Sequence, residues 1–255
     1  MNIERSTISS MLNSATLELE KTNPDSPRLD AEILLSHLLE CPRLDLFLKG
    51  NQPLNSDQMV AYLELLQQRS SGCPVSYLTG EKEFWSFNLE VSKDTLIPRP
   101  DTETLVEYTV EQILKWQKTN EGKTCYIAEL GTGTAAIPLA LCAELKNLHI
   151  TSVDCSEQIL AIAARNIHCY KNLLTPRNNR LDLVQSYLFS AIDSPAKLDL
   201  IVSNPPYIPS DKIADLQTEV SQFEPRNALD GGKDGLFFYR YLLGVAPSML
   251  KKDGK

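Results

Sequence analysis

The most specific chemical feature of the sequence is the tetrapeptide Asn-Pro-Pro-Tyr at residues 204–207, which directly follows the largely apolar run Leu200-Ile201-Val202-Ser203. Such a run predicts a buried strand, and in an open parallel sheet ligands bind beyond the carboxyl ends of the strands. A strand that merely ends in a proline turn is the alternative, and it explains the prolines but not the whole tetrapeptide. We therefore interpret residues 204–207 as part of a ligand-binding cleft.

The groups in this tetrapeptide suit a substrate with a planar nitrogen. The lone pair of an amide or aromatic amine nitrogen is delocalised into the π system, so that nitrogen is a poor nucleophile. The Asn204 side-chain oxygen and the Pro205 carbonyl oxygen can accept its two N–H groups and favour a pyramidal nitrogen. Pro206 helps to fix that carbonyl, and Tyr207 offers a flat face for stacking. We predict a reaction at such a nitrogen, with Asn204, Pro205 and Tyr207 as catalytic residues and all four residues binding substrate.

A glycine-containing loop, ELGTGTAA at residues 129–136, provides a candidate cofactor site. Glycines let the backbone turn sharply and approach a ligand closely. The third glycine of a dinucleotide fingerprint falls on Ala136, which argues against a nicotinamide-type cofactor, and a plain strand–helix turn is the alternative. Asp154 closes the next predicted strand, where a carboxylate can accept both hydroxyls of a ribose, although it can also cap the following helix. Loop and acid together predict an adenosyl cofactor.

The elements that must position these groups alternate between strand and helix from residue 124 onward. Alternation of this kind predicts an α/β fold with a parallel sheet and helices on both faces. A helix capped by Asp101 or Thr102 and running to about Lys118 precedes the first strand. We expect strands at residues 125–130, 148–153, 181–184 and 198–203, and helices at residues 137–144, 156–170 and 235–250.

The first 70 residues predict a small helical bundle with no chemistry of its own. Apolar residues share one face at residues 7–20, a second helix follows Ser26-Pro27, and Asn55 opens a third. His37 is placed within the apolar face of the second helix, where a packed or half-exposed histidine is favoured over a ligand. Residues 84–91 then alternate as in a β-hairpin that turns at Trp85 and Ser86.

The tetrapeptide Asn-Pro-Pro-Tyr is shared by the N6-adenine DNA methyltransferases and by the enzymes that methylate glutamine in the Gly-Gly-Gln loop of peptide chain release factors. The chain resembles the second family, the protein-(glutamine-N5) methyltransferases, along essentially its whole length. Residues 96–103, LIPRPDTE, are similar to that family's interdomain segment. The run Phe223-Glu224-Pro225 followed by Ala228-Leu229 resembles its loop after the catalytic motif. The helical bundle resembles the domain with which that family docks the release factor.

The resemblance implies a class I S-adenosylmethionine-dependent methyltransferase fold, which is Rossmann-like with a mostly parallel sheet. It implies three parts: a helical substrate-docking domain at residues 1–80, a linking hairpin and proline-rich segment at residues 81–100, and a methyltransferase domain at residues 101–255 without its last strands. S-adenosylmethionine is the implied cofactor, with S-adenosylhomocysteine as product. A release factor is the implied partner of a monomeric enzyme that makes no sequence-specific contact with nucleic acid.

The family's cofactor contacts carry over to matching positions of this chain. They are Gly131, Thr132, Gly133, Thr134, Ala135, Asp154, Tyr187, Leu188 and Asn204. Ala135 departs from the family's last loop glycine, and its methyl group is tolerated at negative φ but harmful at positive φ. Tyr187 stands where the family has an acid beside the adenine, so Tyr187 or Leu188 is expected to pack on that ring instead.

The net charge and the charged residues limit which functions remain possible. The 255 residues carry a net charge of -8, and this acidic balance disfavours non-specific binding to nucleic acid. Arg99 and Glu224 fit either the cleft or a surface ion pair, whereas Glu219 and Asp230 are interpreted as solvated. Two rival functions stay open: an N6-adenine methyltransferase acting on nucleic acid, and a catalytically silent module that binds the cofactor.

Apolar runs and cysteines exclude other classes of protein. No window reaches the length of a membrane span, and the N-terminal residues lack the apolar stretch of a signal peptide. The six cysteines contain no C-x-x-C pair and are interpreted as buried, inert thiols, which predicts neither a disulfide framework nor a metal site. Together these features favour a protein of the cytoplasm.

Overall fold

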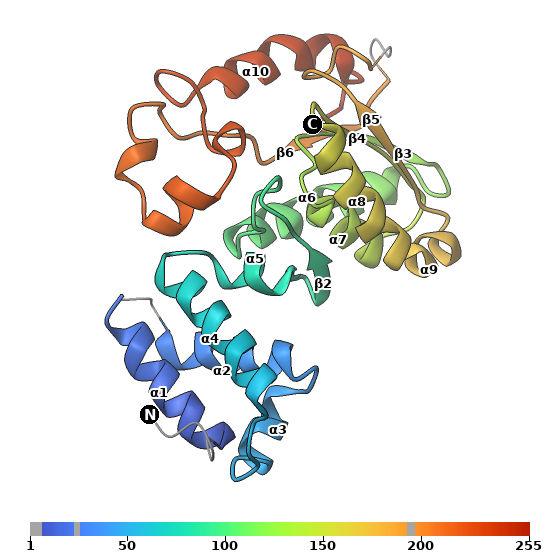
Figure 1. Cartoon of the computed structure of the whole chain (residues 1–255). Helices are drawn as coiled ribbons and strands as arrows, with labels where there is room; N and C mark the ends of the chain where they lie inside the picture. Colours follow the sequence, from blue (N-terminus) through green and yellow to red (C-terminus); the bar gives the residue numbers. More distant parts are fainter. Residues whose placement is uncertain (1–6, 23–25, 193–196) are drawn as a thin grey trace. The chain divides into compact units, whose positions relative to one another are not determined.

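The computed structural model of the chain describes residues 7–22, 26–192 and 197–255. Two compact units make up the chain. The first, here called the helical unit, comprises Met1–Gly80 and Thr218–Phe223, and the second, here called the sheet unit, comprises Glu81–Gln217 and Glu224–Lys255. Figure 1 labels most helices and strands of both units along the chain.

The helical unit packs short helices around an aliphatic core. Its α-helices are α1 (Ile8–Glu20), α2 (Pro27–Leu38), α3 (Arg43–Leu48), α4 (Ser56–Ser70) and α5 (Val75–Thr79). Asn55 begins α4 with a capping box: its side chain accepts the Gln58 N–H at 2.8 Å, and the Gln58 side chain accepts the Asn55 N–H at 3.0 Å. The three helices expected here are confirmed. The short helices α3 and α5 were not expected, because five or six residues show too little periodicity.

The buried face of α2 differs from the expected one. Ala31, Leu34 and Leu35 are fully buried in the core of the helical unit, and the hydroxyl of Tyr62 donates to the Ala31 carbonyl at 2.8 Å. His37 is exposed, so its placement within the apolar face, packed or half-exposed, is wrong. The reason is helical phase, because the face defined by residues 31, 34 and 35 turns residue 37 to solvent.

A segment from the C-terminal half of the chain belongs to the helical unit. Residues Glu219–Phe223 form one turn of π-helix. The Arg69 guanidinium is only 6% exposed and pairs with Asp30 at 2.7 Å and with Glu219 at 2.6 Å. Glu219 is therefore half of an ion pair rather than a freely solvated acid. This pair ties the segment to α4.

The sheet unit contains a four-stranded parallel sheet with helices on both faces, as expected. The strands are β3 (Cys125–Leu130), β4 (Leu148–Asp154), β5 (Arg180–Gln185) and β6 (Leu200–Ser203), in the order β5-β4-β3-β6. Its α-helices are α6 (Asp101–Thr119), α7 (Ala136–Glu144), α8 (Glu157–Cys169), α9 (Lys171–Leu174) and α10 (Phe237–Met249). Three short 3-10 turns cover Thr175–Arg177, Ile213–Asp215 and Arg226–Ala228.

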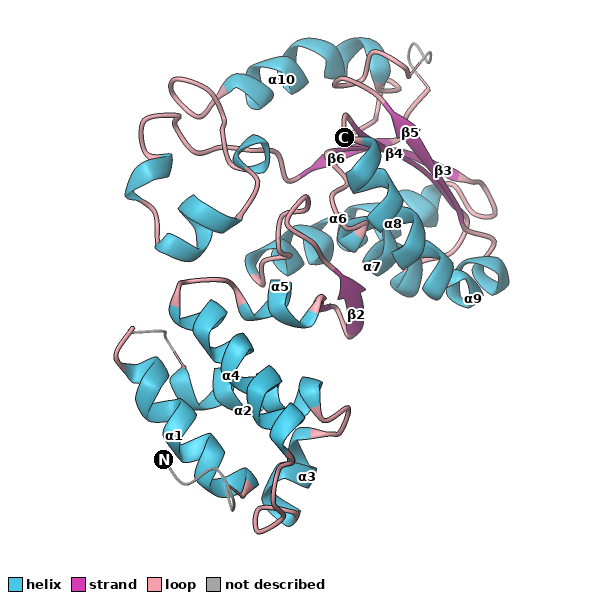
Figure 2. Ribbon diagram, in the orientation of Figure 1, coloured by secondary structure: helices cyan, strands magenta, loops and turns pink. Residues whose placement is uncertain are grey.

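Successive side chains of β3 belong alternately to two hydrophobic cores. Cys125 and Ile127 pack in a core with residues of α6, α7 and α8, whereas Ala128 and Leu130 pack with residues of α10. Figure 2 shows α10 on one side of the sheet and α6, α7 and α8 on the other. Successive side chains of a strand point to opposite faces, so a strand covered on both sides reads as a continuous apolar run.

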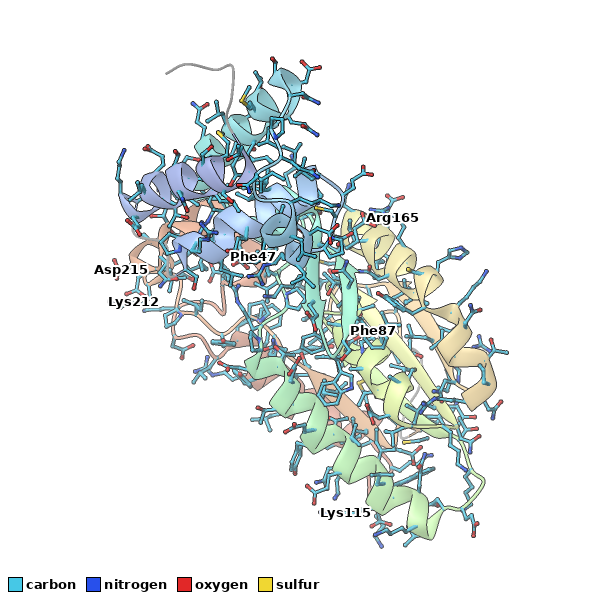
Figure 3. The ribbon with its side chains drawn as sticks, turned by 90° about the horizontal axis from the view of Figure 1, so that it is seen from below. Phe47, Phe87, Lys115, Arg165, Lys212 and Asp215 are labelled. Carbon is cyan, nitrogen blue, oxygen red and sulfur yellow. The ribbon has the colours of Figure 1, made fainter. Side chains whose placement is uncertain are left out.

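The antiparallel hairpin of β1 (Glu81–Phe84) and β2 (Phe87–Glu90) turns at Trp85 and Ser86, as expected. It packs on α8 within the sheet unit. Phe87 meets Tyr170 edge-on at 4.7 Å, and Arg165 pairs with Glu90 at 2.8 Å; Figure 3 labels Phe87 and Arg165. The Asn166 side chain accepts the Glu90 N–H at 2.8 Å and donates to the Thr134 carbonyl at 2.9 Å. The hairpin thus supports the glycine loop.

The beginning of α6 differs from the expected cap. The helix begins at Asp101, and Pro100 precedes it in a helical conformation, with φ −54° and ψ −38° and no side-chain cap. Neither Asp101 nor Thr102 is therefore the N-cap residue. Proline at this position needs no N–H partner and is already set for a helix. The Thr102 hydroxyl is consequently available for a contact outside the helix.

At the β6 edge, the Lys255 carbonyl accepts the Ile201 N–H at 2.8 Å, and the Lys255 N–H donates to the Asp199 carbonyl at 3.0 Å. These two bonds match one rung of a parallel ladder. Within the described ranges, β6 pairs with β3 as its single neighbouring strand. The four strands agree with the number expected from the sequence.

Candidate active site

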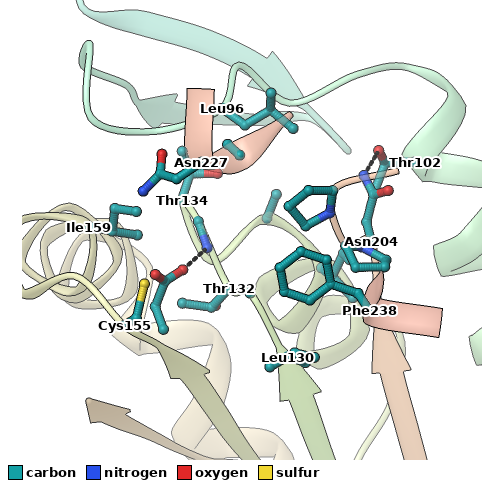
Figure 4. A pocket seen from close by; sticks show the side chains of 18 of the residues that line it. Leu96, Thr102, Leu130, Thr132, Thr134, Cys155, Ile159, Asn204, Asn227 and Phe238 are labelled. Carbon is teal, nitrogen blue, oxygen red and sulfur yellow. Dashed lines mark hydrogen bonds between the residues drawn. The ribbon is translucent and has the colours of Figure 1, made fainter. Parts of the chain in front are cut away.

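A cavity of about 280 Å³ lies in the sheet unit where β3, β4 and β6 end. Figure 4 shows side chains around it. Leu130 pairs with Val153 of β4 and with Ser203 of β6, so the three carboxyl ends are level. The predicted residues on its wall are Gly131, Thr132, Gly133, Thr134, Asp154, Tyr187, Leu188, Asn204, Pro205 and Pro206. The structure thus brings together predicted residues up to 75 positions apart in the chain, from Gly131 to Pro206.

Two predicted residues do not line this cavity. Tyr207 is 56% exposed, and its ring is not part of the wall. Ala135 is fully buried in the core of the sheet unit. Residues without a predicted role complete the wall, among them Leu96, Thr102, Cys155, Ile159, Asn227 and Phe238. They come from separate elements, and no local spacing in the sequence relates them.

The glycine loop leaves open space toward a ligand. The Gly131 and Thr132 N–H groups both donate to the Val153 carbonyl, at 2.9 and 3.1 Å, and so fix the start of the loop. Gly131 and Gly133 have φ of +75° and +55°, and a β-carbon at either would meet nothing within 4 Å. A ligand can therefore lie close to this backbone.

Ala135 occupies the unfavourable conformation. Its φ is +64° and its ψ is 27°, in the left-handed region, where an L-residue with a β-carbon pays about 1 kcal/mol. Burial of the methyl group stabilises the folded state by about 0.8 kcal/mol. The departure from glycine is thus close to neutral because core packing offsets the backbone strain.

Asp154 is directed to the cavity rather than used as a cap. The Ser156 hydroxyl accepts the Ile159 N–H at 3.3 Å, so Ser156 is the residue that caps α8. Asp154, 9% exposed, accepts the Gly133 N–H at 3.2 Å and the Ser156 N–H at 3.4 Å. Burial raises the pKa of Asp154, and these N–H groups oppose the rise. The helix-cap alternative for Asp154 is therefore wrong.

Tyr187 and Leu188 form the cavity wall after β5. Tyr187 is 68% exposed, and Leu188 has a φ of +54°. Positive φ in a branched residue is unusual and concentrates at ligand sites. Their packing against an adenine stays a prediction.

Arg99 and Glu224 form an ion pair at the cavity. Arg99 lies on the wall, and its guanidinium donates to the Glu224 carboxylate, whose side chain is 1% exposed. Glu224 also accepts the Ile97 N–H at 3.4 Å. Arg99 thus lines the cavity and is also ion-paired, whereas neither alternative holds for Glu224, which is buried and does not line the cavity. The pair fixes residues 96–103 against the segment that follows the helical unit's π-turn.

Asp230 stabilises the segment that follows the tetrapeptide. It accepts from the Ser210 hydroxyl at 2.5 Å and the Gly232 N–H at 2.9 Å, and pairs with Arg226 at 3.3 Å. The Ser210 hydroxyl bond is the largest cause that lowers the pKa of Asp230. Its interpretation as a simply solvated acid is therefore wrong, because it organises the turn beside residues 207–210.

Replacement of Gly235 by alanine is expected to lower the free energy of unfolding by roughly 2–4 kcal/mol. Gly235 has a φ of +74°, and a β-carbon there would lie 2.3 Å from the Tyr207 carbonyl oxygen. Gly122→Ala is the matched control, since its φ is +73° and a β-carbon meets nothing within 4 Å. Urea unfolding should show a cost of about 1 kcal/mol for the control. Equal costs for both variants would contradict the close approach to Tyr207.

Glu129 is a candidate that received no role from the sequence. It is fully buried on β3 beside Ser152 of β4, and burial raises its pKa to about 7. Both carboxyl oxygens and the hydroxyls of Thr132 and Ser152 lack a hydrogen-bond partner of good geometry among the described residues. Hydrogen bonding from the nearby Ser152 and Thr132 hydroxyls nevertheless opposes the rise in the pKa of Glu129. Unpartnered buried polar groups beneath a ligand loop suggest a site completed by a bound molecule.

Replacement of Glu129 by glutamine is expected to stabilise the chain more at about pH 8 than at about pH 5. The ordinary pKa is 4.5, so between 4.5 and about 7 the folded chain keeps a proton that the unfolded chain loses. The stability contributed by this protonation is complete below 4.5 and is lost as the pH rises through about 7. The gain at about pH 8 should be on the order of 3 kcal/mol in urea unfolding. Equal gains at both pH values would show that the carboxyl is not protonated in the fold.

Other kinds of site are not evident in the described parts of the chain. Across residues 7–22, 26–192 and 197–255, no group of three or more His, Cys, Asp or Glu side chains is arranged to hold a metal ion. Over the same residues, no helix combines the length and hydropathy needed to cross a membrane. The six cysteines are free, but only Cys125 and Cys142 are buried as expected. Two are half-buried and two are exposed: Cys41 and Cys73, and Cys155 and Cys169.

Two family models match the chain. The PrmC N-terminal domain matches residues 10–80, and the methyltransferase small domain matches residues 111–223. The release factor glutamine methyltransferase of Rhodopirellula baltica is 36% identical over 249 residues, which cover 98% of this chain and 82% of the relative. That of Salmonella typhimurium is 42% identical over 230 residues, which cover 90% of this chain and 78% of the relative.

Solved structures resemble the chain more weakly. A SAM-dependent methyltransferase from Agrobacterium tumefaciens is 14% identical, with a TM-score of 0.44 over 66% of this chain and 47% of that one. Because these values are low, family membership rests on the sequence relatives.

Proposed function

Because the chain belongs to the release factor glutamine methyltransferase family, we propose that it methylates the side-chain amide nitrogen of a glutamine in the Gly-Gly-Gln motif of a release factor, with S-adenosylmethionine as the methyl donor. The observation that carries the proposal is the meeting of Asn204 with the glycine loop and Asp154 around one cavity. A substrate amide and an adenosyl cofactor both need contacts there. The helical unit is the part proposed to dock the factor, and the reaction is proposed to occur in the cytoplasm.

The residues of the cavity fit the cofactor. The backbone at Gly131 and Gly133 leaves room for it, and the buried Asp154 carboxylate offers acceptors for ribose hydroxyls. The Thr132 hydroxyl, which is buried and has no hydrogen-bond partner among the described residues, also belongs to a residue of the wall. When bound, the cofactor supplies a methyl group already activated on a positively charged sulfur.

Asn204 and Pro205 are proposed to hold the glutamine amide. The Asn204 Oδ1 and the Pro205 carbonyl oxygen accept its two N–H groups, which opposes delocalisation of the nitrogen lone pair. Pro205 and Pro206 limit motion of the accepting carbonyl. Neither residue acts as a strong base, because the nitrogen loses its proton after it has gained the methyl group. Positioning and electrostatics therefore account for most of the rate.

Tyr207 is proposed to stack on the substrate rather than to shape the cavity. Its exposed ring leaves a flat apolar face free for a planar group. The ring lies off the cavity wall, so this contact requires the substrate chain to extend past the cavity mouth.

The test is incubation of the chain with methyl-labelled S-adenosylmethionine and a purified release factor. A copy of the factor with the Gly-Gly-Gln glutamine changed to alanine is the control, and duplex DNA is a parallel substrate. Label on the unaltered factor alone is the expected result. Label on DNA would instead assign the chain to the adenine methyltransferases. Cofactor binding without any transfer would favour a silent module.

A further inference from the structure

We infer that Thr102 is a positioning residue, which holds the Asn204 amide so that its oxygen faces the substrate; this inference rests on the proposed function. The Asn204 Nδ2 donates to the Thr102 Oγ1 at 3.1 Å, and both residues lie on the cavity wall (Figure 4). In the described part of the chain, this is the hydrogen bond that the Asn204 side chain makes.

The direction of this bond determines what the substrate meets. An asparagine amide carries an acceptor oxygen on one side and a donor nitrogen on the other. With Nδ2 held by Thr102, Oδ1 is left to accept from an incoming N–H group. A flipped amide would present N–H donors to the N–H groups of the substrate, and neither set would then have an acceptor. Thr102 therefore selects the productive one of two amide orientations.

The location of Thr102 makes this role possible. It is the second residue of α6, where a threonine hydroxyl commonly serves the helix end, but Pro100 precedes the helix and no side-chain cap forms. The Thr102 N–H donates to the Arg99 carbonyl at 3.0 Å, which fixes its backbone. Arg99 is in turn paired with the buried Glu224. The hydroxyl is thus both free of the helix and held in place by its neighbours.

Substitution of valine for Thr102 separates positioning from packing, because valine keeps the shape and removes the hydroxyl. Thr102→Val is expected to lower kcat by about tenfold to a hundredfold, whereas the cofactor Kd changes by less than about threefold. Thr102→Ser restores the hydroxyl and should keep kcat within about threefold of the wild type. Thr109→Val is the matched control on the same helix, since the buried Thr109 hydroxyl donates to the Leu105 carbonyl at 2.7 Å, and its kcat should be unchanged.

A spectroscopic readout tests the contact without any substrate. In chains labelled with ¹⁵N-asparagine, the side-chain NH₂ signal of Asn204 is the one lost in Asn204→Ala. It should shift in Thr102→Val and stay in place in Thr102→Ser and Thr109→Val. If the wild-type chain transfers no methyl group to a release factor, the proposed function fails, and this signal alone decides whether Thr102 holds Asn204.

Two results would overturn the inference. One is an unmoved Asn204 NH₂ signal in Thr102→Val, which would show that the hydroxyl does not bind the amide. The other is an equal loss of kcat in Thr102→Val and Thr102→Ser, which would show that shape rather than the hydroxyl matters.

Discussion

Replacement of Asn204 by alanine is expected to lower kcat for methyl transfer by about a hundredfold to a thousandfold. The variant loses the Oδ1 acceptor, and the Pro205 carbonyl then holds only one of the two N–H groups of the substrate amide. The interaction strengthens as the nitrogen becomes pyramidal, so its loss falls on kcat more than on binding. The measurement is the rate of label transfer to a release factor at saturating cofactor and factor.

Asn172→Ala is the matched control for this experiment. Asn172 is exposed on α9 and does not line the cavity, so its rate should equal that of the wild type. Cofactor binding by Asn204→Ala should weaken far less than kcat falls, because the glycine loop and Asp154, which supply most of the expected cofactor contacts, are intact. Wild-type kcat in Asn204→Ala would remove Asn204 from the proposed chemistry.

Replacement of Arg69 by methionine is expected to destabilise the helical unit by roughly 3–5 kcal/mol. The Arg69 guanidinium is buried between Asp30 and Glu219, and its removal takes the shared cation away from both carboxylates. Asp30 is itself buried, so its charge cannot regain water while the unit stays folded. The same change releases the Glu219–Phe223 turn from α4.

Two optical signals can distinguish this local effect from global unfolding. Trp85 and Trp116 are the two tryptophans of the chain, and both lie in the sheet unit. In Arg69→Met, the far-ultraviolet circular dichroism should change at lower urea concentration, whereas tryptophan fluorescence should change near the wild-type midpoint. Lys21→Met, which removes the exposed pair with Glu18, should cost no more than about 0.5 kcal/mol. Arg69→Met with a wild-type dichroism curve would contradict the buried ion pair.

Elements with several repeats of apolar spacing could be predicted from the sequence. The four parallel strands, α1, α4 and α8 agree with the periodicity, and the hairpin turn falls at Trp85 and Ser86 as expected. Periodicity counts residues, so it fails for α3 and α5, which span fewer than two turns. It also misplaced His37, because apolar neighbours on both sides concealed the helical phase.

Much of the candidate site could be predicted because its residues follow strand ends. Contacts between distant segments could not. The ion pair of Arg99 with Glu224 spans 125 residues, and the bond from Asn204 to Thr102 spans 102. The raised pKa of Glu129 depends on its complete burial, which cannot be predicted from the neighbouring residues in the sequence. The positive φ of Ala135 likewise depends on the turn that the whole loop adopts.

The most direct test of the account is tandem mass spectrometry of a release factor after incubation with S-adenosylmethionine and the chain. The account predicts one added methyl group on the side-chain amide nitrogen of the Gly-Gly-Gln glutamine, and its near absence when Asn204→Ala replaces the wild-type chain. A methyl group on any other residue, or an unmodified factor after incubation with a chain that binds the cofactor, would contradict it.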